Sequence, residues 1–357
     1  MLNGGAFGLR RVFFAFNPLS IFVRIIIFGK GKSTLIIRLH FRKESVILMK
    51  KHIWAICFTA ALIAFTTFIA LDTFVLSAAY NENATGMNTS MFSVRTETQN
   101  EDAQAPDETV QEQTVAVSNE SSYKDGNVSI TLTEYEQYGT TIYVADIELS
   151  STLYLKTAFA NDTYGKNVTE KTSVTAEEND AILAINGDYY GAQEKGYVIR
   201  NGIVYRSSAK GAQVLCIYAD GTMKVVNDRD YTAEELVENG VWQAFSFGPG
   251  LVENGSVSVD ENDEVGRAKA SNSRTAIGLI DAGHFVFVVS DGRTDESEGL
   301  SLYELAEFMQ SLEVKEAYNL DGGGSSTMYF NGEVINNPTS GGKIKEREVS
   351  DIVYIGY

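Results

Sequence analysis

Residues 274–293 read Arg-Thr-Ala-Ile-Gly-Leu-Ile-Asp-Ala-Gly-His-Phe-Val-Phe-Val-Val-Ser-Asp-Gly-Arg, and this stretch decides the kind of fold. Two runs rich in β-branched and aromatic residues, Thr275–Ile280 and Phe285–Ser290, flank the turn Asp281–His284. Short runs of this composition bounded by Gly and Asp are typical of β-strands. The stretch therefore predicts two strands with charged residues at their ends.

The same pattern continues in both directions, from about Asp125 to the C-terminus. Ten further β-rich runs are residues 128–133, 141–149, 154–160, 181–185, 197–200, 214–218, 223–226, 317–320, 327–330 and 352–355. Asn201-Gly202 and Asn331-Gly332 predict hairpin turns, because Asn-Gly tolerates positive φ at both central positions. Thr232/Glu235 and Ser301/Glu304 have the spacing of capping boxes, which predicts two helices. Residues 125–357 are therefore expected to form one α+β domain, with a large mixed or antiparallel sheet and a few helices.

The N-terminal part differs in charge. Residues 1–52 carry ten Lys or Arg and one acid, Glu44, whereas the rest of the chain carries 19 basic and 46 acidic residues. Residues 53–71 contain no charge, and a 19-residue apolar helix spans a hydrocarbon core of ~30 Å. This predicts a basic cytoplasmic segment over 1–52, with Met49 as a natural start, and a transmembrane signal-anchor over 53–76. A signal peptide cleaved near Ser77–Ala79 is the alternative.

Residues 77–124 are polar and hold few large apolar side chains, so we expect a disordered linker. The predicted location is the cell membrane, crossed once through residues 53–71, with the C-terminal domain outside the cell, or secreted if the signal is cleaved. The acidic body excludes nucleic acid as its partner, because it would repel a phosphate backbone.

Few residues suggest a metal or a histidine mechanism. His284 lies in a turn and is the only histidine of the domain, which makes Ser-His-Asp hydrolysis improbable. Cys57 and Cys216 fall in different segments and predict neither a disulfide nor a zinc site. No cofactor is required by the sequence. The acid-rich residues 259–265 allow weak Ca²⁺ binding but deviate from the spacing of a calcium loop.

The segment Leu320–Thr327, Leu-Asp-Gly-Gly-Gly-Ser-Ser-Thr, is the strongest functional signal. Three glycines, Gly322, Gly323 and Gly324, let a backbone approach a ligand and form an anion-binding nest. Ser325, Ser326 and Thr327 add hydroxyls that suit phosphate or sugar oxygens. Asp321 at the strand end is a candidate acid, base or nucleophile.

Other polar residues also border predicted strands. These are Asn186 and Asp188 in Asn186–Tyr190, Arg274, Asp291 and Arg293 in Ser290–Arg293, and Arg347 in Lys345–Glu348. An arginine beside a core strand needs an anionic partner, which is either a substrate or a structural carboxylate. Because no second histidine is present, acid–base chemistry would fall to the aspartates.

Taken together, these motifs resemble the phosphodiester glycosidase domain, the type found in the mannose-6-phosphate uncovering enzyme and in bacterial exopolysaccharide-associated surface proteins. The resemblance covers about residues 125–357 and rests on the order of five segments: Asn186–Tyr190, Arg274–Gly278, Asp291–Arg293, Gly299–Ala306 and Asn319–Thr327. It departs at Asp188, where the family often has a small residue.

The resemblance implies hydrolysis of a sugar 1-phosphodiester at the sugar C1–O bond, on cell-wall or exopolysaccharide glycans. It implies Asp321 and Asp291 as catalytic carboxylates, with Asp188 as a further candidate. It implies substrate contacts from Asn186, Arg274, Arg293, the 322–327 run and Arg347. The alternatives are an ordinary glycoside hydrolase or transglycosylase on the same fold, and a non-catalytic glycan-binding module on a membrane stalk.

Overall fold

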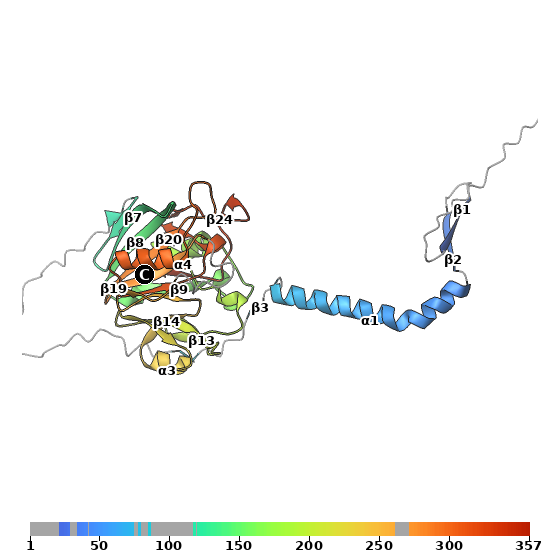
Figure 1. The fold of residues 1–357 in the computed structure, drawn as a ribbon, viewed down its shortest axis with the longest axis horizontal. Coiled ribbons are helices and arrows are strands. Elements are labelled where there is room, and N and C mark those ends of the chain that lie inside the picture. The colour runs from blue at the N-terminus through green and yellow to red at the C-terminus, as the bar shows by residue number, and fades with distance from the viewer. Residues whose placement is uncertain are drawn as a thin grey trace, which may run out of the picture. The chain divides into compact units, whose positions relative to one another are not determined.

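The computed structural model describes residues 21–28, 34–41, 43–74, 78–79, 85–86, 117–118, 120–260 and 271–357. The chain divides into two compact units, residues 1–75 and 76–357 (Figure 1).

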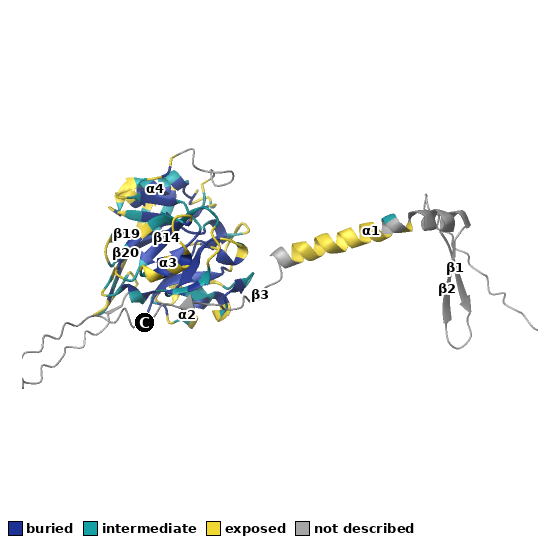
Figure 2. Ribbon diagram, turned by 90° about the horizontal axis from the view of Figure 1, so that it is seen from below, coloured by how far each residue is buried: buried dark blue, intermediate teal, exposed yellow. Residues whose placement is uncertain are grey.

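The first unit contains a hairpin and a long helix. Strands β1 (Ile21–Phe28) and β2 (Thr34–Phe41) pair antiparallel. Helix α1 (Lys43–Phe74) includes the predicted apolar helix, and its apolar side chains are exposed (Figure 2). Those exposed by 42–64% are Ile53, Phe58, Leu62, Ile63, Phe65, Phe68, Ile69 and Leu71. No helix among the described residues has both the length and the apolar composition needed to cross a membrane, and the predicted transmembrane span is not confirmed.

The second unit is built on three sheets. The strands of the nine-stranded sheet, in spatial order, are β18 (Ser256–Val257), β17 (Gly250–Glu253), β21 (Glu316–Asn319), β19 (Thr275–Asp281), β20 (His284–Ser290), β8 (Thr140–Leu149), β7 (Val128–Gln137), β6 (Ser122–Lys124) and β5 (Val117–Ser118). Strands β5 and β6 precede Asp125, so the predicted domain boundary lies inside this sheet.

The other two sheets are smaller. The six-stranded sheet has the order β15 (Met223–Asn227), β14 (Gln213–Tyr218), β16 (Val241–Phe245), β12 (Val198–Arg200), β13 (Ile203–Arg206) and β4 (Thr85–Gly86). The five-stranded sheet has the order β23 (Glu333–Val334), β22 (Met328–Phe330), β11 (Leu183–Asn186), β26 (Asp351–Ile355) and β9 (Leu155–Phe159). Two pairs stand apart, β10 (Gly165–Lys166) with β3 (Ala78–Ala79), and β24 (Thr339–Ser340) with β25 (Lys343–Ile344).

All strand pairs formed by the described residues are antiparallel, so the sheets are not mixed. Asn201 and Gly202 join β12 to β13 with φ of 51° and 75°, and Asn331 and Gly332 join β22 to β23 with φ of 48° and 98°. Both hairpin predictions are confirmed. Strand β16 lacks a clear alternating pattern and was not predicted, because all five of its residues are buried.

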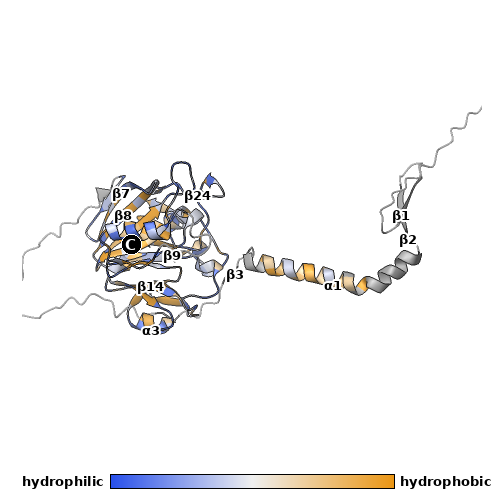
Figure 3. Cartoon of the chain, viewed as in Figure 1, coloured by the Kyte–Doolittle hydropathy of each residue, from blue (hydrophilic) through white to orange (hydrophobic). Residues whose placement is uncertain are grey.

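Three helices cover the sheets: α2 (Thr172–Glu178), α3 (Ala233–Glu238) and α4 (Leu302–Ser311). Both predicted capping boxes form, since Thr232 and Ser301 accept from the backbones of Glu235 and Glu304 at 3.1 Å. The amphipathic α4 packs its apolar face on the nine-stranded sheet. Figure 3 shows the hydropathy of the chain, with hydrophobic residues of β14 in orange.

The central strands alternate between two cores. In β20, Phe285, Phe287 and Val289 face the main core, whereas Val286 and Val288 face α4. Side chains on a strand alternate between faces, so a strand covered on both faces is apolar throughout. This explains the unbroken apolar run that marked β20 in the sequence, and it fixes the direction in which the following residue, Asp291, leaves the sheet.

Candidate active site

The predicted polar segments meet where the strands of two sheets begin or end. In the nine-stranded sheet, β19 begins at Thr275, β20 ends at Ser290 and β21 ends at Asn319. In the five-stranded sheet, β11 ends at Asn186, while β22 and β26 begin at Met328 and Asp351. Because neighbouring strands run antiparallel, the end of one strand lies beside the start of the next. Residues distant in sequence are thereby placed together.

Asn186 joins the two sheets at this edge. Its Nδ2 donates to the carbonyl of Asp321 at 2.7 Å, and its Oδ1 accepts from Thr275 Oγ1 at 2.8 Å and from the Thr327 amide at 3.3 Å. The side chain is fully buried. Asn186 was predicted to contact substrate, but its polar atoms are used within the protein, so its role is to hold the 321–327 loop in place.

Asp321 forms an ion pair with Arg347. Its Oδ2 lies 2.7 Å from Arg347 Nη2 and accepts from Ser325 Oγ at 2.6 Å, and its Oδ1 accepts from the Gly322 amide at 3.0 Å. Arg347 Nε also donates to Ser325 Oγ at 2.9 Å. The Arg347 side chain is 42% exposed and that of Asp321 is 12% exposed. The pair therefore borders solvent and can exchange its partners for a ligand.

The environment of Asp321 favours its protonated form. Burial raises the pKa of the Asp321 carboxyl, and Arg347 together with the hydrogen bonds from Ser325 and Gly322 lowers it only in part. The net shift of the pKa is upward. A carboxyl group tuned in this direction is a better proton acceptor at neutral pH than an ordinary aspartate.

Most amides of residues 322–326 are hydrogen-bonded within the protein. The amides of Gly322, Gly323, Ser325 and Ser326 all donate to protein oxygens. The glycines instead admit close neighbours: a Cβ on Gly322 would lie 2.8 Å from the Ser273 carbonyl, and one on Gly324 would lie 3.2 Å from Ser340 Oγ. The close packing is a second reason for glycine at these positions, and phosphate binding by this backbone stays a prediction.

The three hydroxyl residues that follow are also turned inward. Ser325, Ser326 and Thr327 have no exposed surface. Ser325 serves the Asp321–Arg347 pair, Ser326 Oγ lies 3.2 Å from Thr275 Oγ1, and the Thr327 amide binds Asn186. The Thr327 hydroxyl is buried and has no hydrogen-bond partner among the described residues, and contact of these hydroxyls with sugar or phosphate oxygens stays a prediction.

The two arginines of the first sheet lie on either side of the loop. Gly322 packs against the backbone of Ser273 and Arg274, and Arg274 Nε donates to the Leu300 carbonyl at 2.8 Å. Arg274 is 7% exposed. Arg293 is exposed, donates from Nε to Asn272 Oδ1 at 2.6 Å, and places its guanidinium next to Gly323, 3.0 Å from where a Cβ would be. Of the two, Arg293 is the one that solvent can reach.

Asp291 holds a neighbouring loop. Its Oδ1 accepts from the Asn337 amide at 2.8 Å and from Asn336 Nδ2 at 3.2 Å, and its Oδ2 accepts from Asn337 Nδ2 at 3.1 Å. Asn336 Nδ2 also binds the Ser326 carbonyl at 3.1 Å. Asp291 is 3% exposed. It therefore connects to the Asp321 loop through Asn336, but its lone pairs already have donors, which favours a positioning role over the predicted catalytic one.

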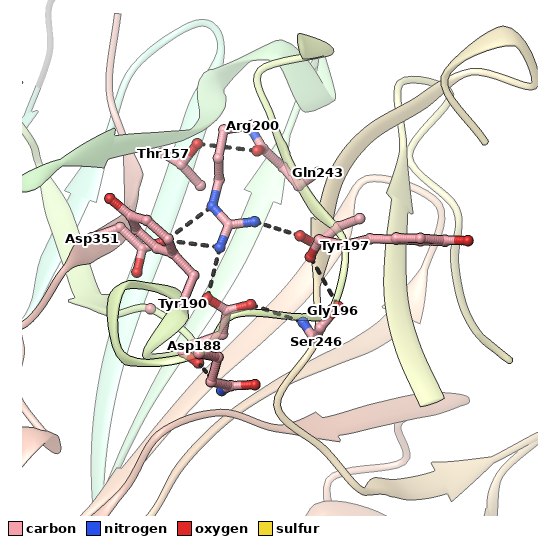
Figure 4. Close-up of polar contacts among 12 residues, drawn as sticks. Thr157, Asp188, Tyr190, Gly196, Tyr197, Arg200, Gln243, Ser246 and Asp351 are labelled. Atoms are coloured by element: carbon pink, nitrogen blue, oxygen red, sulfur yellow. Dashed lines mark hydrogen bonds and ion pairs between the residues drawn. The ribbon is translucent and has the colours of Figure 1, made fainter. Parts of the chain in front are cut away.

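Asp188 faces the core and pairs with Arg200, as Figure 4 shows. Arg200 Nη2 lies 2.8 Å from both Asp188 Oδ1 and Asp351 Oδ2, and Asp188 Oδ2 accepts from the Ser246 amide at 2.8 Å. All three charged side chains are at most 2% exposed. A carboxylate enclosed in this way has no access to substrate, so the geometry does not support Asp188 as catalytic.

Asp351 completes this network and was missed from the sequence. Burial and the nearby Asp188 raise the pKa of Asp351 to about 7, against the opposing effect of Arg200. Asp351 Oδ1 has no hydrogen-bond partner within the described residues. A Cβ on Gly187 would lie 2.1 Å from that oxygen, which explains the glycine of Asn186-Gly187-Asp188. The available signal was Arg200 itself, an arginine ending a predicted strand.

Other features lie elsewhere. Two hollows are lined by residues 149–153, 219–221 and 282–283, and by residues 124–129, 148–150 and 282–284. They sit at the opposite end of β8 and β20, about 20 Å away along seven residues of strand.

Within 120–260 and 271–357, no three His, Cys, Asp or Glu residues gather as metal ligands. Most of the acid-rich segment 259–265 lies outside the described residues.

Comparison with known proteins identifies relatives of this domain. A family model described as phosphodiester glycosidase matches residues 179–356. The human N-acetylglucosamine-1-phosphodiester alpha-N-acetylglucosaminidase is 34% identical over 185 residues, 46% of this chain and 35% of that protein. The SPbeta prophage-derived uncharacterized protein YomE of Bacillus subtilis is 30% identical over 200 residues, 54% of this chain and 31% of that protein. The chain thus spans about a third of the length of these curated relatives.

Two solved structures share the fold. One is the zebrafish N-acetylglucosamine-1-phosphodiester alpha-N-acetylglucosaminidase catalytic domain, auto-inhibited by its pro-peptide, with a TM-score of 0.52 and 23% identity over 64% of this chain and 83% of that one. The other is a hypothetical protein from Synechocystis, with a TM-score of 0.51 and 14% identity over 64% of this chain and 62% of that one. The chain therefore belongs to the phosphodiester glycosidase family through residues 179–356, which hold the site built around Asp321 and Arg347.

Proposed function

We propose that this domain hydrolyses sugar 1-phosphodiesters, releasing the sugar and leaving a phosphate monoester. The observation that carries the proposal is the Asp321–Arg347 pair, a carboxyl of raised pKa bound to a half-exposed guanidinium where two sheets meet. A glycosidase of this kind needs a carboxylate near C1 and cations for the phosphate.

Asp321 and the two exposed arginines, Arg347 and Arg293, each have a chemical task in this proposal. Arg347 and Arg293 bind the phosphodiester oxygens, because a guanidinium fork matches phosphate geometry. Asp321 accepts a proton from the attacking water, whose oxygen bonds to C1 as the C1–O bond to phosphate breaks. The electron pair of that bond leaves on the phosphate monoester. Since phosphate is a good leaving group, charge stabilisation matters more than a strong acid.

The substrate to test first follows from the relatives. The human and bovine proteins are named for N-acetylglucosamine-1-phosphodiester, and both are 34% identical to this chain over 185 residues. We propose the same sugar here, carried on cell-wall or exopolysaccharide glycans. No divalent cation has a task in this mechanism, and activity that EDTA abolishes would contradict that part of the proposal.

The test is release of free N-acetylglucosamine from an N-acetylglucosamine-1-phosphodiester by the purified full chain. Asp321→Asn is expected to lower kcat by about 100-fold or more, the usual loss when an acid–base group is removed. Asp281→Asn is the matched control, because Asp281 pairs with Lys315 on the surface at the far end of β19. Equal rates in wild type and Asp321→Asn would remove Asp321 from the mechanism. Sugar binding without turnover by wild type would favour the glycan-binding module.

We further propose that α1 ties the domain to a membrane, with the domain outside the cell. The large apolar side chains described between Ile53 and Leu71 of α1 are exposed, and such a helix needs an apolar cover. The ten basic residues before Ile53 favour the cytoplasmic side for the N-terminus. We expect the wild-type full chain to stay in the membrane fraction during carbonate extraction. We expect the Leu62→Arg variant to be released. A wild-type chain found in the soluble fraction would contradict it.

A further inference from the structure

Tyr189 is an exposed aromatic residue in a backbone conformation that disfavours it. It has φ 62° and ψ 29°, in the left-handed region, and 45% of its surface is exposed. A bulky side chain at positive φ is a genuine outlier, and such strain gathers at functional sites. Because the Tyr189 ring is exposed, packing of the core does not explain its strained backbone conformation.

Comparison with other residues at positive φ makes Tyr189 stand out. Eleven non-glycine residues of the described part have positive φ, and seven of them are Asn or Asp, which tolerate it. Tyr138 and Glu313 occupy the β7–β8 turn and the end of α4. The two that remain are Tyr189 and Arg293, and both lie at the candidate site.

The neighbours of Tyr189 force it outward. Asp188 is fixed by Arg200 and by the Ser246 amide, both at 2.8 Å. Tyr190 is fully buried and stacks on Tyr164 with ring centroids 5.2 Å apart and planes at 20°. Two anchored residues on either side hold the backbone at Tyr189 in place (Figure 4 shows both anchors). An aromatic side chain on a fixed backbone has few rotatable bonds, so it can bind a ligand at a modest entropic cost.

The ring lies next to the proposed reaction centre. The Cζ atom of Arg347 is 5.9 Å from the centroid of the Tyr189 ring, and the same guanidinium pairs with Asp321. An exposed aromatic face beside a carboxylate and a cation is suited to the apolar C–H face of a pyranose. A substrate phosphate on Arg347 would bring its sugar within reach of the ring.

We propose that Tyr189 is the sugar-binding platform of the site, and that it selects phosphodiesters of a pyranose over those of simple alcohols. This rests on the proposed function for the identity of the substrate. The ring supplies the contact and the hydroxyl is not needed. Tyr189 binds substrate in both the ground and transition states, so it contributes to KM more than to kcat.

The test compares Tyr189→Asn with Tyr138→Asn in the full chain. Tyr138 is a matched control, with φ 54° and 42% exposure in a turn outside the site. Asn suits positive φ, so both variants should keep or raise the melting temperature. Tyr189→Asn should raise KM for the sugar phosphodiester about 10-fold, the size of one aromatic contact, with kcat within about threefold. Tyr189→Phe and Tyr138→Asn should keep the wild-type KM.

Direct sugar binding separates this inference from the proposed function. Saturation-transfer NMR with free N-acetylglucosamine should show contact with wild type and with Tyr189→Phe, and none with Tyr189→Asn. Turnover by wild type with unchanged KM in Tyr189→Asn would overturn the platform and leave the function standing. Sugar binding that depends on Tyr189 but is not followed by turnover would support the platform and contradict the proposed function. A lower kcat and a shifted pH profile at unchanged KM would show that the ring only positions Arg347, which also overturns the platform.

Discussion

The Asp321–Arg347 pair and the Asp188–Arg200–Asp351 network use the same chemical groups at the same edge of the fold, but they differ in access to solvent. The closest N···O distances are nearly equal, 2.7 Å and 2.8 Å. Arg347 is 42% exposed, whereas Arg200 is 1% exposed. An ion pair at the surface contributes little to stability and can open for a ligand, whereas breaking a buried one leaves an uncompensated charge.

This difference assigns the two sets to different tasks. Arg200 fixes Asp188 and Asp351, and through them the loop that presents Asn186 and Tyr189. Arg347 stays free to exchange Asp321 for a phosphate. The buried network therefore serves as the scaffold for the Asp321–Arg347 pair.

The largest effect is expected from Arg200→Met. It would leave Asp188 and Asp351 buried without their cation, at a cost of about 3–5 kcal/mol in the free energy of unfolding. Urea unfolding followed by tryptophan fluorescence measures it. A loss below about 1 kcal/mol would mean that water reaches this network, and the contrast with Arg347 would disappear.

The next effect is a pH dependence of stability from Asp351. The pKa of Asp351 is raised to about 7 in the folded state, from an ordinary value of 3.8. Between these two pH values the folded protein therefore holds a proton on Asp351 that the unfolded protein releases. The contribution of this proton binding to the free energy of unfolding is fully present below pH 3.8 and is lost as the pH rises through about 7.

Asp351→Asn isolates that contribution. The amide resembles the protonated carboxyl, so we expect wild type and variant to be similar at pH 5 and the variant to be more stable at pH 8. Melting temperatures at both pH values provide the measurement. If wild type became more stable relative to Asp351→Asn as the pH rises, the pKa of Asp351 would be shifted in the opposite direction.

Gly187→Ala probes the contact between the two regions. The new Cβ would meet Asp351 Oδ1 at 2.1 Å, and such overpacking costs about 1–3 kcal/mol. Gly250→Ala is the control, because its nearest neighbours lie at 3.4 Å, an ordinary contact. Equal unfolding free energies of the two variants would show that Asp351 can move aside.

The smallest effect is expected for Arg347→Met on stability. Because Arg347 is 42% exposed and Asp321 borders solvent at 12%, the loss in the free energy of unfolding should be smaller than for Arg200→Met, on the order of 1 kcal/mol. The same variant should lose most hydrolysis of the sugar phosphodiester. A large loss of stability would place Arg347 in the scaffold together with Arg200.

Local patterns predicted much of the fold. The run Phe285–Ser290, the turns at Asn201 and Asn331, and the capping box at Ser301 all depend on residues close in sequence, and all were confirmed. Strand β16 was missed because burial on both faces removes the alternating pattern. Strands β5 and β6 were missed because a polar edge strand resembles a linker.

The site was predicted only in outline. Asp321 and Arg347 were named, and the structure brings them together across 26 residues. The structure encloses Asp188 with Arg200 and bonds several amides of the 322–327 loop within the protein, and residue type alone does not reveal such contacts. Arg200 and Asp351 were given no role in the site, since their pairing spans 151 residues.

The sequence alone determined many of the strands, two helix caps and most of the polar residues at strand ends, because these follow from backbone preferences over a few residues. Only the tertiary structure decided which carboxylates are enclosed with Arg200 and which one pairs with the half-exposed Arg347. Burial and long-range charge pairing depend on how the sheets meet. They set the pKa of Asp321 and Asp351, and they hold Tyr189 in the position where we propose it binds sugar.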